Sequence, residues 1–227
     1  MTVSAVLFGA IGTLAETSDL QRKAFNAAFA EAELPWVWNR DTYRMLLTKP
    51  GGRARIARQA QALGVEDQVD IDALYQSKLK HFGERLHAGI YPRSGVQQVM
   101  RVARVRGIKI GFATTTGKGQ VDDILNGLSA HIERDQFDWI GHGGLVSKGK
   151  PSPEIYEVAL KALGVSPAEA IAIEDTPESA EAALAAGLRT IGFPGAAAER
   201  RSFPEGVTIM RELSATLLDD SQRIAAE

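Results

Sequence analysis

The chain of 227 residues contains no cysteine, few aromatic residues (7%) and no apolar run long enough to cross a bilayer. Without cysteine it forms neither a disulfide framework nor a thiolate metal site. No segment resembles a signal peptide, so we expect a cytoplasmic protein. An excess of charge of one sign is also missing, since the net charge is −2. This balance argues against nucleic acid or an anionic membrane as a partner.

The rest of the composition is that of an ordinary globular protein. Hydrophobic residues make up 44% of the chain and charged residues 24%. A chain of this length forms one sizeable core, or a core with a small inserted domain. We find no internal repeat and no low-complexity segment.

The first segment has the pattern of a buried strand that runs into a loop. Residues 3–8 form an apolar run of strand length, and the glycines and threonine of Gly9-Ala10-Ile11-Gly12-Thr13 interrupt it. Open parallel sheets keep their chemistry in loops at the carboxyl ends of strands. The only side chain in this loop that could act as an acid, base or nucleophile is the hydroxyl of Thr13.

Residues 18–88 are predicted to consist of helices and turns. Ser18 as N-cap and Gln21 fit a capping box, and an apolar stripe follows as far as Pro35. Further helices are predicted up to residue 47, over 53–63 after the break at Pro50-Gly51-Gly52, and over 70–87. We expect Trp36 and Trp38 to lie in a core.

After Pro92 the pattern alternates between helix and strand. Helices are predicted over 94–106, 119–128, 152–163 and 176–186, and strands over 108–113, 139–141, 170–173, 190–193 and 207–209. Such alternation is typical of an α/β fold with a parallel sheet. We therefore predict a Rossmann-like core from residues 1–17 and 89–227, with an inserted α-helical cap domain over 18–88.

The first strand and the loop that ends in Gly12-Thr13-Leu14 resemble the first motif of the haloacid dehalogenase (HAD) superfamily. In that family the motif is D-x-D-G-T, where the first Asp attacks phosphorus and the second is the general acid and base. The resemblance places these roles on Gly9 and Ile11, so both carboxylates are missing.

Two later segments resemble the family's phosphate-binding motifs. Thr114 and Thr115 follow a predicted strand where the family has a Ser or Thr that binds phosphate, although threonine is also a common turn residue. Lys150 opens a stretch that matches K-P-x-P-x-x-[FY] throughout. The resemblance implies that Lys150 neutralises phosphate, whereas a solvated lysine before a helix is the simpler alternative.

Glu174 and Asp175 stand where the family's fourth motif places its magnesium-binding acids. A role at a helix N-terminus is the alternative for this pair. With two acids left beside Lys150, too few carboxylates remain to hold Mg²⁺ well. We expect weak or absent Mg²⁺ binding, and an ion pair between Lys150 and Asp175.

The cap segment resembles the CbbY-type branch, sugar-phosphate phosphatases that include xylulose-1,5-bisphosphate phosphatase. That branch carries E-x-x-H where this chain has Ser18 and Gln21. Arg53 and Arg55 keep the basic stretch of the cap, which implies contacts with a substrate anion, although a solvated basic face is an equal alternative.

Two functions follow from these features. The first is a HAD-like protein without catalytic activity, a pseudoenzyme that binds phosphate, a phosphosugar or another small phosphorylated metabolite, or a partner protein. The second is an active Mg²⁺-dependent hydrolase that uses a displaced carboxylate, for which Glu16 and Asp19 are the candidates. A decayed relative with a structural role only is a third possibility. Loss of a covalent nucleophile typically lowers kcat by about 10⁴ to 10⁶.

Overall fold

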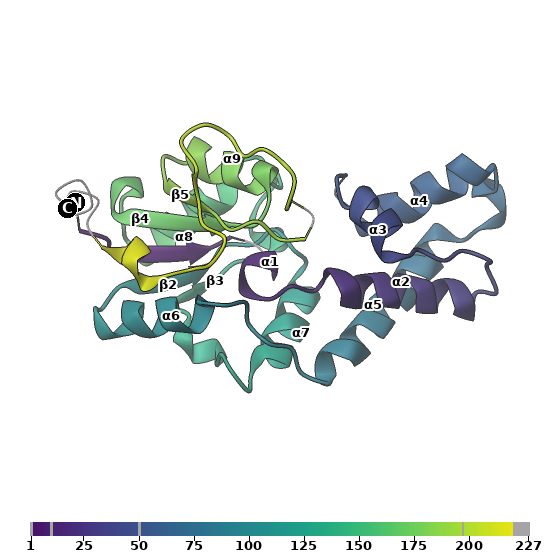
Figure 1. Ribbon diagram of the computed structural model, residues 1–227, viewed down its shortest axis with the longest axis horizontal. Helices are drawn as coiled ribbons and strands as arrows, with labels where there is room; N and C mark the ends of the chain where they lie inside the picture. Colours follow the sequence, from purple (N-terminus) through teal and green to yellow (C-terminus); the bar gives the residue numbers. More distant parts are fainter. Residues whose placement is uncertain (1, 10, 50, 197, 220–227) are drawn as a thin grey trace. The chain divides into compact units, whose positions relative to one another are not determined.

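The chain divides into two compact units in the computed structural model, which describes residues 2–9, 11–49, 51–196 and 198–219 (Figure 1). One unit comprises Met1–Glu16 and Gly89–Glu227, and the other comprises Thr17–Ala88. The first boundary predicted from the sequence lies one residue later, between residues 17 and 18. Pro50, part of a predicted break, and residues 1 and 220–227, at the predicted ends of the core domain, lie outside the described residues.

The first unit is built on a sheet of six parallel strands in the order β3-β2-β1-β4-β5-β6. These strands are β1 (Ala5–Phe8), β2 (Lys109–Phe112), β3 (Trp139–Ile140), β4 (Ala170–Glu174), β5 (Arg189–Gly192) and β6 (Thr208–Ile209). Strands β1 and β4 are fully buried, as expected for the centre of a parallel sheet. The predicted α/β fold with a Rossmann-like sheet is confirmed.

Helices connect the strands of this unit. They are α1 (Ile11–Leu14), α6 (Val96–Val105), α7 (Lys118–Leu128), α8 (Glu154–Leu163) and α9 (Pro177–Ala185), with short 3₁₀ turns at Arg134–Gln136, Gly143–Leu145, Pro167–Glu169 and Ala215–Leu218. Each helix predicted after Pro92 is present. Helix α9 begins as predicted, with Thr176 at the N-cap and Pro177 at the first helical position.

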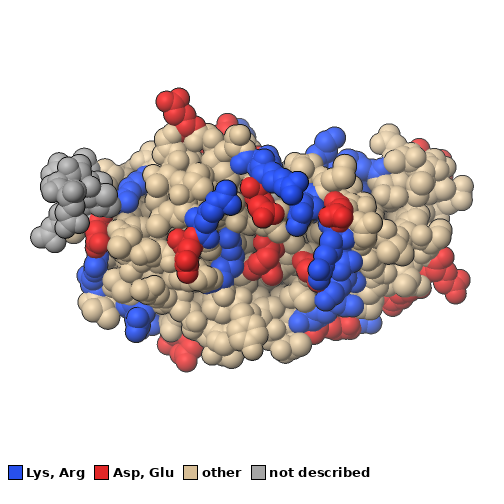
Figure 2. All heavy atoms as spheres, in the orientation of Figure 1, with Lys and Arg blue, Asp and Glu red and all other residues tan. Residues whose placement is uncertain are grey.

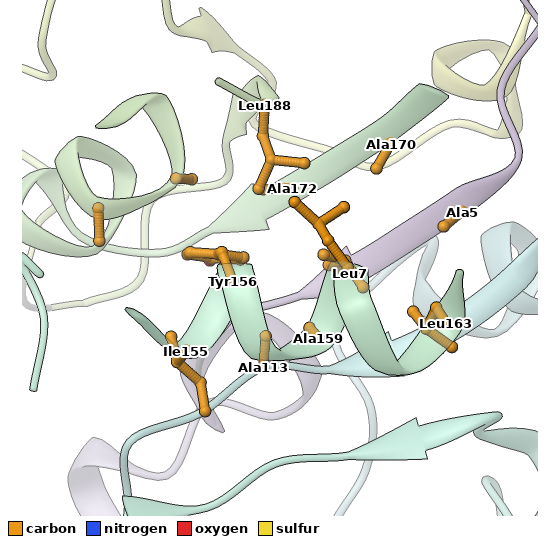
Figure 3. Packing of buried hydrophobic residues seen from close by; sticks show 13 residues of the cluster. Ala5, Leu7, Ala113, Ile155, Tyr156, Ala159, Leu163, Ala170, Ala172 and Leu188 are labelled. Atoms are coloured by element: carbon orange, nitrogen blue, oxygen red, sulfur yellow. The ribbon is translucent and has the colours of Figure 1, made fainter. Parts of the chain in front are cut away.

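Helix α8 packs on the face of the sheet to which alternate residues of β1 and β4 point. Figure 3 shows Tyr156, Ala159 and Leu163 of α8 beside Leu7 of β1. Ala172 of β4 belongs to the same cluster. Because side chains alternate along a strand, this packing fixes which face each residue at the end of β4 can reach.

The second unit is helical, as predicted for residues 18–88. Its helices are α2 (Ser18–Glu31), α3 (Arg40–Leu46), α4 (Gly52–Leu63) and α5 (Ile71–His87), with a 3₁₀ turn at Glu66–Gln68. An aromatic cluster fills its centre, in which Phe25 lies 4.9 Å from Trp38 and Phe29 lies 5.3 Å from Trp36, measured between ring centroids. Both tryptophans are buried, which confirms their predicted place in a core.

Two predicted helix caps are wrong. The N-cap of α2 is Thr17 and not Ser18, and the Gln21 side chain donates to the Thr17 hydroxyl at 3.4 Å. Helix α6 begins after Gly95, which adopts a left-handed conformation, and not after Ser94. The Ser94 hydroxyl donates instead to Glu212 at 3.0 Å. A tertiary contact thus holds the Ser94 side chain that the local pattern assigned to capping.

Acidic and basic side chains are interspersed on the face of the molecule seen in Figure 2. This mixture agrees with the net charge of −2. Among the described residues, none of the helices combines the length and apolar character needed to cross a membrane.

One buried cation of the helical unit lies among aromatic rings. The Lys78 side chain is 1% exposed, and its ammonium lies 5.0 Å from the Phe25 ring centroid and 4.7 Å from that of Phe82. It donates to the Gln21 side chain at 3.2 Å. Burial lowers the pKa of Lys78 to about 8, and the positive charge of Arg55 adds to this effect.

This low pKa predicts how stability depends on pH. Folding penalises the charged form of Lys78, so stability should rise between pH 8 and 10.5 as the unfolded chain keeps the extra proton. We expect Lys78→Met to remove this rise, by up to about 3 kcal/mol. Urea unfolding at a series of pH values measures it, with Lys80→Met on the exposed face of α5 as the control. Parallel profiles for wild type and Lys78→Met would contradict the assignment.

Candidate functional site

The candidate site lies at the carboxyl edge of the sheet in the first unit. Strands β1, β2 and β4 run parallel and end there side by side. The backbone N–H of Gly9 donates to Ile173 at 2.9 Å, and that of Ala113 donates to Phe8 at 2.8 Å. Hydrogen bonds of the sheet therefore hold the loops that follow these three strands next to one another. Ala10, within the first loop, lies outside the described residues.

Lys150 reaches this edge from the segment that precedes α8. Its ammonium donates to the Gly9 carbonyl at 2.6 Å, to Glu174 Oε1 at 2.5 Å and to the Tyr156 hydroxyl at 3.2 Å. The Lys150 side chain is 7% exposed, so little of this charge faces solvent. The structure thus brings Lys150 to the predicted loop.

The expected ion pair between Lys150 and Asp175 is wrong, because Lys150 pairs with Glu174. Glu174 is the last residue of β4, and its side chain points to the face covered by α8, where Tyr156 donates to the same oxygen. Burial raises the pKa of Tyr156 well above its usual value, and the negative charge of Glu174 raises it further. The phenol therefore stays protonated and acts as a donor to Glu174.

The side-chain space at Gly9 is filled by its neighbours. A Cβ atom placed on Gly9 would overlap the Glu174 carboxylate and the Tyr156 hydroxyl. A Cβ atom on Gly12 would likewise overlap the carboxylate of Asp175. Both acids of the fourth motif thus lie against glycine backbone of the first loop, which is possible only because these positions have no side chain.

Asp175 lies beneath this loop in an unusual electrostatic setting. Its Oδ1 atom is buried and accepts no hydrogen bond from the described residues. Burial raises the pKa of Asp175 to about 7, and the negative charge of Glu174 contributes, although Lys150 and Arg93 oppose the shift. Oε2 of Glu174 is also buried, with no partner within the described ranges. Two carboxylate oxygens at this edge are therefore unsatisfied.

Thr114 follows β2 at the same edge. It is 2% exposed, and its hydroxyl oxygen accepts from the Thr116 N–H at 3.1 Å and lies 3.0 Å from the Thr116 hydroxyl. These contacts organise the loop itself. Thr115 is half-buried in the same loop. Phosphate binding by Thr114 and Thr115 stays a prediction.

The two arginines predicted to contact an anion lie in the other unit and differ in environment. Arg53 is exposed and forms a bidentate ion pair with Asp72, with one N–O distance of 2.9 Å. Arg55 is 5% exposed and donates to the carbonyls of Leu46 at 3.1 Å and Lys49 at 3.2 Å. Arg55 thus supports the start of α4 from inside the unit, while contact of either arginine with an anion remains a prediction.

Glu174 and Asp175 are also the predicted metal ligands. Across the described parts of the chain, no three His, Asp or Glu side chains come together in an arrangement that could hold a metal ion. Of the two predicted ligands, Glu174 already accepts from Lys150 and Tyr156.

Sequence reasoning missed two residues that shape the site. Tyr156 occupies the aromatic position of the third motif, but its bond to Glu174 was not foreseen. Arg93 donates to the carbonyls of Gly12 at 2.7 Å and Phe193 at 2.9 Å, and so ties the first loop to the loop after β5. The only sequence signal for Arg93 is a basic residue just after the unit boundary.

Comparison with known proteins identifies the class. The chain belongs to the haloacid dehalogenase-like hydrolase family, whose model matches residues 6–193. Within this family, which generally uses Mg²⁺, it belongs to the CbbY-like branch of sugar-phosphate phosphatases. Protein CbbY from Cereibacter sphaeroides is 40% identical over 195 residues, which cover 85% of each chain.

Two further comparisons concern phosphorylated sugars. A crystal structure of a CbbY mutant from Rhodobacter sphaeroides, in complex with xylulose-(1,5)bisphosphate, is 35% identical with a TM-score of 0.79 and covers 93% of this chain and 95% of that one. A phosphorylated carbohydrates phosphatase from Thermotoga maritima is 28% identical over 83% of this chain and 84% of the relative.

The raised pKa of Asp175 predicts a loss of stability as the pH rises. The folded state holds the proton more tightly than the unfolded chain between pH 3.8 and about 7, so stability should fall through this window. Asp175→Asn should remove that fall, by about 4 kcal/mol at most. Urea unfolding in EDTA measures it. As a control, Asp72→Asn should leave the profile in this window unchanged, because the hydrogen bond with Arg53 lowers the pKa of Asp72 and confines its titration to more acidic pH.

The filled space at Gly9 predicts that even a methyl group is disfavoured there. Gly9→Ala should destabilise the protein by about 1 to 3 kcal/mol, as is typical of overpacking. Chemical denaturation measures this loss, and Gly119→Ala in α7 is the control because a Cβ atom there meets open space. Equal effects of the two substitutions would show that the space at Gly9 is not filled.

Proposed function

We propose that this chain is a catalytically impaired member of its family, a pseudoenzyme that binds phosphate or a phosphosugar without hydrolysing it. The observation that carries the proposal is Gly9. At the position that the family's nucleophile occupies there is no side chain, and Glu174 and Tyr156 leave no room for one. Ile11, at the position of the general acid and base, has no proton to give.

Transfer of a phosphoryl group to the protein needs a carboxylate in line with phosphorus and an acid for the leaving oxygen. Glu174 is the carboxylate that adjoins Gly9, but one of its oxygens is held by Lys150 and Tyr156. The Oε2 atom of Glu16 accepts from the Ala196 N–H at 2.8 Å. Asp19 pairs with Arg22 at 2.9 Å and Lys23 at 3.1 Å. These contacts argue against each displaced nucleophile.

Mg²⁺ binding is proposed to be weak or absent. Mg²⁺ requires near-octahedral oxygen ligands and gives up its water reluctantly. Glu174 and Asp175 each have one buried oxygen without a hydrogen-bond partner among the described residues, and the nearby ammonium of Lys150 opposes a second cation. These residues do not fit a resident Mg²⁺.

Ligand binding is supported by what the carboxyl edge retains. Lys150 supplies a positive charge beside Gly9, and Thr114 and Thr115 follow the neighbouring strand. The relatives named for phosphorylated carbohydrates favour a phosphosugar as the ligand class. Such a ligand is a small metabolite, in keeping with the expected cytoplasmic location.

Two measurements on the purified protein test this function. With Mg²⁺ and either p-nitrophenyl phosphate or a sugar bisphosphate, we expect no turnover above the buffer. A ligand at 100 times its dissociation constant should stabilise the protein by about 2.7 kcal/mol. Thermal shifts with inorganic phosphate and phosphosugars measure that stabilisation.

The Gly9→Asp/Ile11→Asp double variant is the matched positive control. It restores both carboxylates, and we expect it to gain Mg²⁺-dependent turnover as Glu174 withdraws from the space beside position 9. Mg²⁺-dependent hydrolysis by the wild type above the buffer would refute the impaired chemistry, whatever the rate of the double variant. Absence of any thermal shift would refute the binding role.

A further inference from the structure

The ammonium group of Lys150 has no hydrogen-bond donor left for a ligand. A lysine ammonium has three N–H donors. Lys150 faces three acceptors within the first unit, namely the Gly9 carbonyl at 2.6 Å, Glu174 Oε1 at 2.5 Å and the Tyr156 hydroxyl at 3.2 Å. An anion that approaches Lys150 must therefore displace one of these groups.

The three acceptors differ in how firmly they are held. The Gly9 carbonyl belongs to backbone whose N–H is bonded to Ile173 at 2.9 Å, so the sheet fixes it. The Tyr156 ring is fully buried in the cluster around α8. The Glu174 carboxylate sits at the end of a side chain, and its Oε2 atom has no partner among the described residues.

Glu174 is also the group that an anion resembles in chemistry. Its carboxylate presents a negative oxygen to Lys150 as a phosphate would. It reaches this position because Gly9 leaves the space open, and the Tyr156 hydroxyl donates to the oxygen that faces Lys150. Glu174 thus occupies the anion contact of Lys150, the absence of a side chain at Gly9 makes room for it, and the Tyr156 hydroxyl holds it there.

We propose that Glu174 is a built-in competitor for anions at Lys150, and that Tyr156 is the latch that keeps it there. The site is closed by its own carboxylate, and phosphate binds only as Glu174 leaves Lys150. This inference rests on the proposed binding function and concerns the regulation of the same site.

Titration with inorganic phosphate in EDTA tests the competitor. Isothermal titration calorimetry compares the wild type with Glu174→Gln, whose neutral amide still accepts a hydrogen bond but competes less well than a charge. We expect phosphate to bind about tenfold more tightly to Glu174→Gln. Glu169→Gln is the matched control, because it removes one negative charge at the opposite end of β4 and should leave the affinity unchanged.

Tyr156→Phe tests the latch and guards against misfolding of the first variant. Glu174→Gln removes the charged partner of a buried lysine, which can destabilise a protein. Tyr156→Phe carries less risk, because the K-P-x-P-x-x-[FY] pattern accepts Phe at this position. We expect Tyr156→Phe to bind phosphate about tenfold more tightly than the wild type, since the hydrogen bond that Tyr156 donates to the charged Glu174 carboxylate is lost. Adding Lys150→Met to either variant should abolish the gain. Circular dichroism and thermal melting verify that each variant is folded.

The outcomes separate this inference from the proposed function. Tighter binding by Glu174→Gln and Tyr156→Phe than by the wild type supports the competitor, even if the wild type binds too weakly to measure and the binding function fails. Equal, measurable binding by all three proteins overturns the competitor and leaves the binding function standing. No binding by any of them overturns both.

Discussion

The neutralisation of the Lys150 ammonium is the constraint around which the carboxyl edge of the sheet is arranged. The charge is almost fully removed from water, and a buried cation is costly unless nearby groups pair with it. Its partners come from the end of β1, the end of β4 and helix α8, which lie far apart in the sequence. Parallel pairing of β1 with β4 and the packing of α8 bring them together. Fold and site are thus one arrangement, because the contacts that position the strand ends also satisfy the lysine.

Periodicity and turn chemistry predicted most of this fold. Continuous apolar runs and helix-breaking glycines located the strands and helices of both units, because those signals are local. These local signals could not predict whether Glu174 or Asp175 pairs with Lys150. The pairing depends on which face the last residue of β4 points to, and hence on the pleat of a strand whose end the sequence does not mark. The N-cap of α2 was also misplaced by one residue, from Thr17 to Ser18. The sequence pattern predicts the presence of a helix better than its first residue.

Buried cations were the other feature that sequence could not reveal. Arg55 lies in a stretch of alternating basic residues that reads equally well as a solvated helix face, and Lys78 lies among the polar residues of α5. Their burial depends on the aromatic cluster, where Arg55 lies over the Phe25 and Tyr43 rings, 5.9 Å and 5.4 Å from the centroids. Rings attract cations and partly offset the lost hydration. The sequence pattern of one helix cannot show which side chains of the neighbouring helices cover its basic residues.

Gly9 shows how neighbouring groups fill the space beside a residue without a side chain. Protein interiors tolerate few voids, so this space is taken by the groups nearest to it. Here those groups are Glu174 and Tyr156, and Glu174 brings a charge that pairs with Lys150. A carboxylate at position 9 would meet both side chains and would place a second negative charge beside Glu174. Such a side chain therefore requires Glu174 to withdraw, so packing and electrostatics together oppose it.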